Sequence, residues 1–185
     1  MMELRRTPLY EEHVARGGKI VPFAGYGLPV HFSTGIQEEH RAVREAAGLF
    51  DVSHMGQVEV RGRDALAFVQ HLTVNDAGAL RVGQAQYSLF CREHGGVVDD
   101  LLVYRVDETE YLLIVNGARR AEDLAWMSSN QAGFDVSLED RADAFALLAL
   151  QGPAAENVLS RVAGAQVGAL PPSHHRMVTV EGVDV

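Results

Sequence analysis

The chain has 185 residues, of which 47% are hydrophobic, and its formal charge at pH 7 is −9. This length can bury a sizeable core, the negative charge argues against nucleic acid as a partner, and no apolar run approaches the roughly 20 residues of a membrane-spanning helix. No apolar signal segment follows the first residues, which predicts a cytoplasmic protein, and the single cysteine, Cys91, excludes an internal disulfide or a multi-cysteine metal site within this chain.

The N-terminal part is predicted to begin with a helix and a loop. Thr7-Pro8 has the pattern of an N-cap followed by proline at the first helical position, and the helix should stop near Gly17-Gly18. Residues 21–30 mix aromatic residues with glycine and proline, which indicates a packed irregular loop. Residues 36–47 have the apolar spacing of an amphipathic helix that Gly48 ends.

A strand and a helix should follow before the middle of the chain. Val58 and Val60 alternate with charged residues, as in a half-exposed strand. Asp64 has the position of a cap for a helix that carries Leu66, Phe68, Val69 and Leu72.

The middle of the chain is predicted to be an antiparallel meander. Its strands should cover residues 84–92, 97–106 and 111–116, because turn residues separate these three β-rich runs. A helix over residues 118–129 should follow, with Leu124, Ala125 and Trp126 on its apolar face. The remaining elements expected are a buried strand at 145–150, a helix opened by Gly152-Pro153, and a strand at 177–180. These elements predict an α+β fold with a largely antiparallel sheet and flanking helices.

Two adjacent acids, Asp99 and Asp100, interrupt the apolar strand that follows Gly95-Gly96. Successive strand residues face opposite sides, so at least one of these carboxylates should point toward a packed layer or a pocket. Burying an unpaired carboxylate costs free energy, which makes a functional acid one interpretation. The alternative is an edge strand with one acid in water and the other capping a neighbouring backbone.

Three other patterns are set aside. His174-His175 could bind metal, but neighbouring residues on an extended chain point apart and no third ligand is near, so no metal site is predicted. Asp51, Ser53 and His54 lie too close in the chain to assemble a catalytic triad. No glycine pattern that cradles phosphate follows a strand, so neither ATP nor NAD is indicated.

Five ordered blocks of the chain resemble the T-protein, or aminomethyltransferase, of the glycine cleavage system, in its N-terminal half. The blocks are Thr7-Pro8-Leu9-Tyr10 with Gly17-Gly18-Lys19, Phe23-Ala24-Gly25-Tyr26 with Leu28-Pro29-Val30, Leu49-Phe50-Asp51-Val52-Ser53-His54-Met55, Gly95-Gly96-Val97-Val98-Asp99-Asp100-Leu101, and Leu150-Gln151-Gly152-Pro153. The resemblance implies a tetrahydrofolate-dependent transferase. Such an enzyme takes the aminomethyl group from the lipoyl arm of the H-protein, releases ammonia and passes the one-carbon unit to tetrahydrofolate.

The resemblance also implies the site. Asp100 matches the family's essential acid, which can stabilise the cationic, iminium-like species formed as the amine leaves. Asp99 is expected to be its structural partner, and an exchange of these two roles stays open. The positions that match folate contacts are Met55, Tyr87, Ile114, Val115 and Asn116. Residues 1–185 are expected to form the N-terminal portion of the folate-binding region, with a sub-domain joint near 168–173.

The chain is expected to stop about halfway through a usual T-protein, before later segments that help to hold folate, so this chain alone is not expected to carry full turnover. Two alternatives remain. One is another tetrahydrofolate-binding domain of the superfamily, as in sarcosine or dimethylglycine dehydrogenases or a demethylase. The other is a non-catalytic, folate-dependent iron-sulfur maintenance protein.

Overall fold

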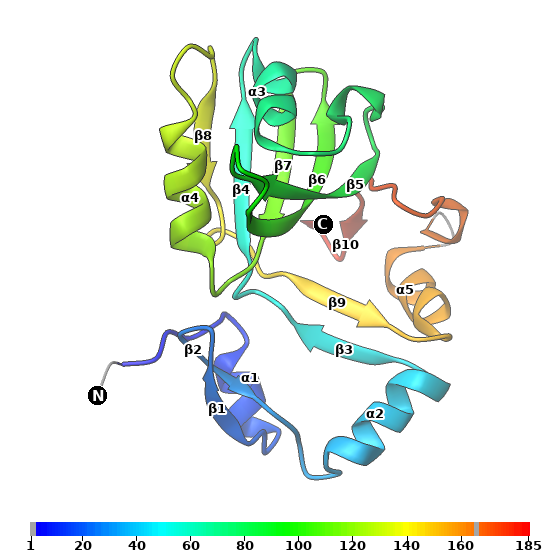
Figure 1. The fold of residues 1–185 in the computed structure, drawn as a ribbon. Helices are drawn as coiled ribbons and strands as arrows, with labels where there is room; N and C mark the ends of the chain where they lie inside the picture. The colour runs from blue at the N-terminus through cyan, green and yellow to red at the C-terminus, as the bar shows by residue number, and fades with distance from the viewer. Residues whose placement is uncertain (1–2, 165–166) are drawn as a thin grey trace. The chain divides into compact units, whose positions relative to one another are not determined.

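The computed structural model describes residues 3–164 and 167–185, which form two compact units. The sheet unit comprises residues 55–144 and 171–176, and the terminal unit comprises residues 3–54, 145–164, 167–170 and 177–185. The helices are α1 (Tyr10–Ala15), α2 (Ile36–Glu45), α3 (Ala65–Leu72), α4 (Arg120–Ser129) and α5 (Ala155–Ala163), with short 3-10 turns η1 (Ala77–Ala79) and η2 (Val167–Ala169) (Figure 1).

The strands form one five-stranded sheet and three two-stranded ones. They are β1 (Ile20–Phe23), β2 (Tyr26–Pro29), β3 (Gly48–Asp51), β4 (Gly56–Arg61), β5 (Ala85–Cys91), β6 (Val97–Asp107), β7 (Glu110–Val115), β8 (Ser137–Asp140), β9 (Leu148–Gln151), β10 (Thr179–Val180) and β11 (Val183–Asp184). All pairings between these strands are antiparallel, and the predicted α+β class is confirmed.

The sheet unit is built on the order β5-β6-β7-β4-β8. The predicted meander is confirmed as β5, β6 and β7, and β4 then pairs with β7, with Val58 opposite Leu113. β8 was not predicted, because its four residues are mostly polar and carry no apolar alternation. The strand and helix predicted from Val58 to Leu72 are confirmed as β4 and α3.

One face of this sheet carries the core, and α3 and α4 cover it (Figure 1). Phe68 of α3 and Met127 of α4 are fully buried in one cluster with Val58, Val103 and Leu113 of the strands. Alternate strand residues supply this cluster, as expected for a sheet with one helix-covered face. Both helices therefore pack on one face of the sheet, and the side chains of Leu102 and Ile114 lie on the other face.

Two predictions for helices of the sheet unit are wrong in detail. Asp64 holds the N-cap position of α3 but accepts a hydrogen bond from the Asp135 backbone N–H at 2.8 Å, so it ties two loops together instead of capping. Leu124 and Trp126 pack against the core as predicted, but Ala125 is exposed and the fully buried positions of α4 are Asp123 and Met127. The spacing of four residues places Asp123 and Met127 on one helix face, so a carboxyl group lies on the buried face of α4.

The terminal unit differs from the prediction in its first 30 residues. The segment predicted as an irregular loop is a β1–β2 hairpin, in which Ala24 and Gly25 have φ values of 49° and 82°. Positive φ at both turn residues allows a tight two-residue hairpin. The glycine and proline residues of this segment had favoured the prediction of an irregular loop. Thr7 does not cap α1, because the N-cap is Leu9 and the Thr7 hydroxyl bonds elsewhere.

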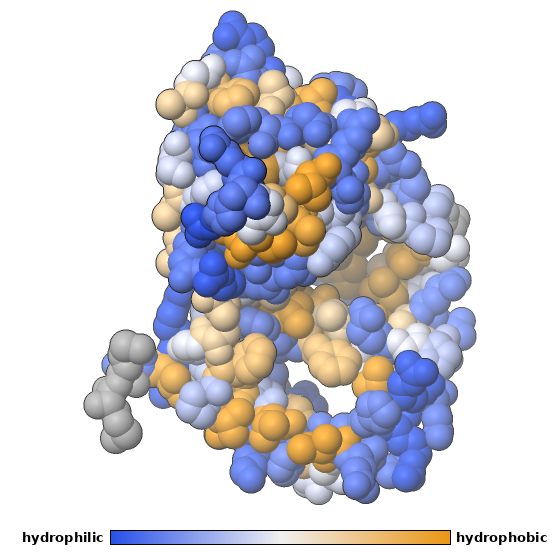
Figure 2. Space-filling view, viewed as in Figure 1, coloured by the Kyte–Doolittle hydropathy of each residue, from blue (hydrophilic) through white to orange (hydrophobic). Residues whose placement is uncertain are grey.

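The second pairing in the terminal unit joins β3 to β9, with Leu49 opposite Leu150. The strand at 145–150 was predicted to be buried, but Leu148 is 48% exposed and Leu49 is 65% exposed. Figure 2 shows apolar residues reaching the surface over β1 and β3, whereas the surface over α2 is mostly hydrophilic. An apolar run predicts a strand but does not reveal whether another element covers it. Within residues 3–164 and 167–185, no helix has both the length and the apolarity to cross a membrane.

Candidate functional site

Asp99 and Asp100 occupy opposite faces of β6, as the alternation of strand side chains requires. Asp99 alternates in step with the buried Leu101 and Val103, two and four residues further along β6, so its side chain lies on the helix-covered face of the sheet. Asp100 is on the same sheet face as the exposed Leu102, two residues further along the strand, and it pairs with Leu89 of β5. Both carboxylates are half-buried, and the expectation that one of them points toward a packed layer is confirmed for Asp99.

Asn116 joins the two carboxylates. It directly follows β7, beside the pair Leu101 and Val115, and its side-chain nitrogen lies 2.9 Å from Asp100 Oδ1 and 3.1 Å from the Asp100 carbonyl oxygen. The same nitrogen lies 3.1 and 3.2 Å from the two carboxylate oxygens of Asp99. Only the NH₂ end of an amide can donate to these four acceptors, so the orientation of Asn116 is determined by its neighbours. The amide oxygen is the part left to accept a hydrogen bond from a ligand.

Two of the other predicted contact residues share the sheet face of Asp100, and a third lies at the end of the sheet that carries Asn116. Tyr87 of β5 and Ile114 of β7 both pair with Leu102, so they share the face of Asp100. A hydrogen bond to Asp100 is the main reason that the pKa of the exposed Tyr87 lies above its ordinary value of 10. Met55 directly precedes Gly56, which pairs with Val115, and it is therefore at the end of the sheet that carries Asn116.

Val115 is the predicted contact residue that the structure sets apart. Its side chain is fully buried in the core cluster, on the same sheet face as Tyr111 and Leu113. The sheet therefore brings Asp100, Tyr87 and Ile114 together on one face and places the Val115 side chain on the other.

Asp123 is the residue at this site that the sequence did not single out. Its side chain is fully buried on α4, within hydrogen-bonding reach of Asp99. The pKa of Asp123 is raised to about 8; burial is the largest cause, and the hydrogen bond and charge of Asp99 act in the same direction. The signal available in the sequence is its position four residues before Met127, which aligns it with the buried face of the helix.

The profile of the GCVT N-terminal domain matches residues 9–185, nearly the whole chain. The chain belongs to this family. The GCVT N-terminal domain described here is 53% identical over 162 residues to a protein named aminomethyltransferase from Desulfitobacterium hafniense strain Y51, and 56% identical over 156 residues to one from Thermus thermophilus. These alignments cover 88% and 84% of this chain but 44% of each relative.

A solved structure gives the same result for the fold. The crystal structure of glycine cleavage system aminomethyltransferase T from Bartonella henselae superposes with a TM-score of 0.81 at 36% sequence identity. It covers 86% of this domain, and the aligned part is 44% of the Bartonella chain. The domain thus spans about half the length of the relatives that it matches, and the predicted family resemblance is confirmed.

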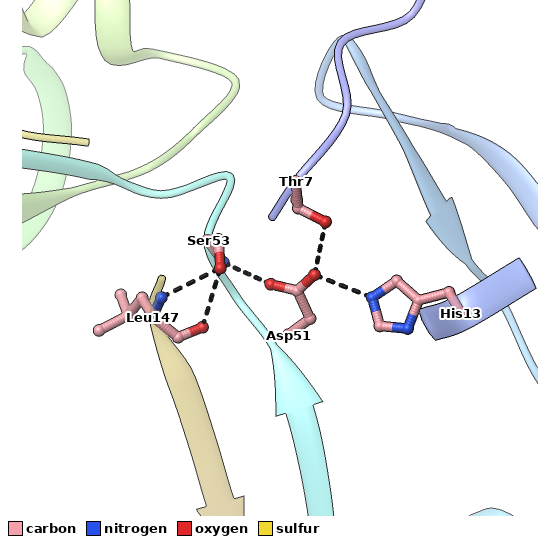
Figure 3. Close-up of polar contacts among 5 residues, drawn as sticks. All are labelled: Thr7, His13, Asp51, Ser53 and Leu147. Atoms are coloured by element: carbon pink, nitrogen blue, oxygen red, sulfur yellow. Dashed lines mark hydrogen bonds and ion pairs between the residues drawn. The ribbon is translucent and has the colours of Figure 1, made fainter. Parts of the chain in front are cut away.

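Asp51 and Ser53 of the GCVT N-terminal domain form a hydrogen-bond network with Thr7, His13 and Leu147, and not a triad (Figure 3). Asp51 Oδ2 accepts a hydrogen bond from the Thr7 hydroxyl at 2.6 Å and lies 2.8 Å from His13 Nε2. The Ser53 side chain bonds to the backbone of Leu147, at 3.0 Å from its nitrogen. His54 packs edge-on against Phe23, with ring centroids 5.3 Å apart.

This network joins four separate segments within the terminal unit, and its centre is an ionised acid. Burial acts to raise the pKa of Asp51, but hydrogen bonds from Ser53, Thr7 and His13 outweigh it and leave the pKa below its ordinary value of 3.8. A carboxylate that accepts several hydrogen bonds is stabilised in its charged form. Asp51 therefore stabilises the folded domain whenever it is ionised.

Asp51→Asn should lower the free energy of unfolding at neutral pH by about 1–3 kcal/mol, the usual cost of disrupting buried hydrogen bonds to a charged group. Because the folded pKa of Asp51 is depressed, its stabilisation is complete above the unfolded pKa and is lost as the pH falls through the folded one. The stability difference from the unsubstituted domain should therefore shrink below about pH 4. Urea unfolding at several pH values would measure it, and a difference that stays constant into acid would contradict the assignment.

The two adjacent histidines of the GCVT N-terminal domain have separate protein partners. His174 Nδ1 lies 2.9 Å from the Pro172 carbonyl oxygen, and His175 Nε2 lies 3.1 Å from that of Arg105. The His175 ring also packs edge-on against Tyr104. Among residues 3–164 and 167–185, no three His, Cys, Asp or Glu side chains are grouped so that they could hold a metal ion.

Proposed function

We propose that this GCVT N-terminal domain supplies the folate site of an aminomethyltransferase of the glycine cleavage system. The reaction moves the one-carbon unit of an aminomethyl group, carried on the lipoyl arm of the H-protein, to tetrahydrofolate and releases ammonia. The observation that carries the proposal is the Asp100 carboxylate, which Asn116 holds at 2.9 Å on the sheet face shared with Tyr87 and Ile114. The names of the relatives agree with this activity.

In this proposal Asp100 has an electrostatic role. As ammonia leaves, the methylene carbon acquires iminium-like positive charge, and a fixed carboxylate near it stabilises that charge without reorganising. The folate nitrogens attack this carbon and lose their protons, while the leaving amine and the lipoyl sulfur each take up one proton, so the transfer needs no oxidant or reductant. The Asn116 NH₂ group fixes the orientation of the Asp100 carboxylate. A carboxylate that is already hydrogen-bonded loses little conformational freedom when the substrate binds.

The remaining residues would hold the pterin. Tyr87 and Ile114 offer an aromatic ring and an aliphatic side chain on the Asp100 face, and the Met55 thioether suits a flat heteroaromatic ring. The Asn116 amide oxygen can accept a hydrogen bond from a heterocycle N–H. Val115 would act as support from the core face. The H-protein as partner, a cytoplasmic location and a sub-domain joint near residues 168–173 remain predictions.

Calorimetric titration of the chain with a stable reduced folate tests the proposal. We expect saturable binding that Asp100→Asn weakens by about tenfold or more, because a charge-assisted hydrogen bond contributes about 1.5–3 kcal/mol. Asp107→Asn, which neutralises an exposed acid at the far end of β6, is the matched control and should bind like the unsubstituted chain. Absence of binding, or equal weakening by both substitutions, would contradict a folate site at Asp100.

A further inference from the structure

Asp123 is a fully buried acid that no cation of the described chain bonds. Neither of its carboxyl oxygens has a hydrogen-bond partner when the group is taken as ionised, among residues 3–164 and 167–185. Leaving a buried carboxylate without donors costs far more than leaving a neutral group there. The side chain therefore requires either a donor or a proton of its own.

The nearest polar neighbour of Asp123 is another acid. Asp99 lies within hydrogen-bonding reach of it, and two ionised carboxylates at this distance repel one another in a poorly hydrated site. One shared proton removes the repulsion, because a protonated acid can donate a hydrogen bond to its ionised neighbour. The pair then carries one negative charge.

The surroundings indicate which acid holds the proton. Asp99 accepts hydrogen bonds from the Asn116 amide on both of its oxygens, at 3.1 and 3.2 Å. Asp123 has no such donor and is the more deeply buried of the two. The proton therefore belongs on Asp123.

The charged groups around Asp123 do not reverse this assignment. Arg119, just before α4, favours the ionised form, whereas Glu122 on α4 and Asp99 on β6 disfavour it. The Arg119 guanidinium is paired with Glu122 and donates to the Val98 carbonyl oxygen at 3.3 Å, so its charge is largely compensated. The raised pKa of Asp123, about 8, agrees with the geometry.

We propose that Asp123 is a positioning residue: as a neutral carboxylic acid it donates a hydrogen bond to the Asp99 carboxylate, which holds the Asn116 amide against Asp100. The chain of contacts begins at Asp123 on α4, which bonds Asp99 on one face of β6. Asn116 then joins Asp99 to Asp100 on the other face. Its consequence for folate rests on the proposed function, but the proton itself does not. The inference explains why β6 carries two consecutive acids, since one faces the ligand and the other faces the proton donor.

Carbon-13 NMR of the aspartate side-chain carboxyls tests the proton directly, without folate. Between about pH 5 and about pH 10, one carboxyl should stay protonated through neutrality and titrate near pH 8. Asp123→Asn should remove this resonance, whereas Asp107→Asn, an exposed acid on the same strand as Asp99, should leave it. If the resonance assigned to Asp123 titrates with the ordinary acids, the proposal is wrong.

Two substitutions with the same branched side-chain skeleton separate the hydrogen-bonding role of position 123 from its shape. Asparagine at position 123 can still donate an N–H to Asp99, whereas leucine cannot. Hydrogen exchange of the Asn116 side-chain NH₂ should therefore be about tenfold faster in Asp123→Leu than in Asp123→Asn, because a hydrogen bond to a charged group is lost. Equal exchange rates in the two variants would exclude the positioning role, and should Asp123→Leu fail to fold, the carboxyl titration decides alone.

The folate titration repeated with these variants keeps the two proposals distinct. If the unsubstituted chain binds folate, Asp123→Asn should stay within about twofold of it at neutral pH, and Asp123→Leu should bind about tenfold more weakly. Above pH 8 only the unsubstituted chain should lose affinity, since only it can ionise at position 123. If the chain does not bind folate but the NMR resonance titrates near pH 8, the proposed function fails and the buried proton stands.

Discussion

The unsubstituted chain should lose stability relative to Asp123→Asn as the pH rises from about 4 to about 8, by several kcal/mol in total. The folded pKa of Asp123, about 8, is raised above its ordinary value of 3.8, so the folded state holds a proton that the unfolded state releases. Stability from such a group is complete below the unfolded pKa and is lost as the pH rises through the folded one. Each pH unit between the two values corresponds to about 1.4 kcal/mol.

Urea unfolding of both proteins across this range would measure the effect. Subtracting the two curves isolates position 123, because every other titrating group is common to the two chains. The difference should level off above about pH 8, where both states of the unsubstituted chain have lost the proton. A difference that does not vary with pH would show that Asp123 has the same pKa folded and unfolded. If the unsubstituted chain instead gained stability relative to Asp123→Asn as the pH rises, the folded chain would hold Asp123 in its ionised form.

Phe68→Ala should lower the free energy of unfolding of the sheet unit by about 3–5 kcal/mol, the range for removing a buried phenylalanine from a core. Phe68 is fully buried on α3 and meets the Phe134 ring edge-on, with centroids 5.3 Å apart. Its removal leaves a cavity between the helix and the sheet, and the sheet cannot close it without losing its register. The loss is a large part of the stability of a single domain.

Val74→Ala provides the comparison, because Val74 follows the same helix but is 55% exposed. It should change the unfolding free energy by less than about 0.5 kcal/mol, as most exposed substitutions do. Denaturant unfolding followed by the fluorescence of Trp126, which lies in the sheet unit, would report both values. A loss below about 1 kcal/mol for Phe68→Ala would mean that α3 does not hold this core together.

Local patterns predicted most of the sheet unit correctly. Turn residues between apolar runs placed β5, β6 and β7 within one or two residues, because each run alternates or is bounded by glycine and acids. The β1–β2 hairpin was missed, since its tight turn depends on a positive φ at Ala24, which an alanine in the sequence does not announce. The exposure of Leu148 was missed because burial depends on which elements cover a strand.

The candidate site could be predicted in part for the same reason. Two consecutive acids in an apolar strand are visible in a sequence, and their opposite faces follow from strand geometry alone. The contacts that connect them are not visible. Asn116 lies 16 residues beyond Asp100 and looks like an ordinary residue before a turn, and Asp123 looks like a solvated helix residue. Only the pairing of β6 with β7 and the packing of α4 bring these side chains to the acids.

The division of the chain into units has a consequence for the order in which it folds as it is synthesised. The main segment of the sheet unit, residues 55–144, is continuous, so its five strands and two covering helices emerge together and their contacts are local. The terminal unit cannot close until β9 emerges to pair with β3, about a hundred residues later in the chain. Pairings between such distant segments form slowly, because a long loop must close first. Until then the apolar residues of β3 are an unpaired edge on the nascent chain, which is a surface that chaperones recognise.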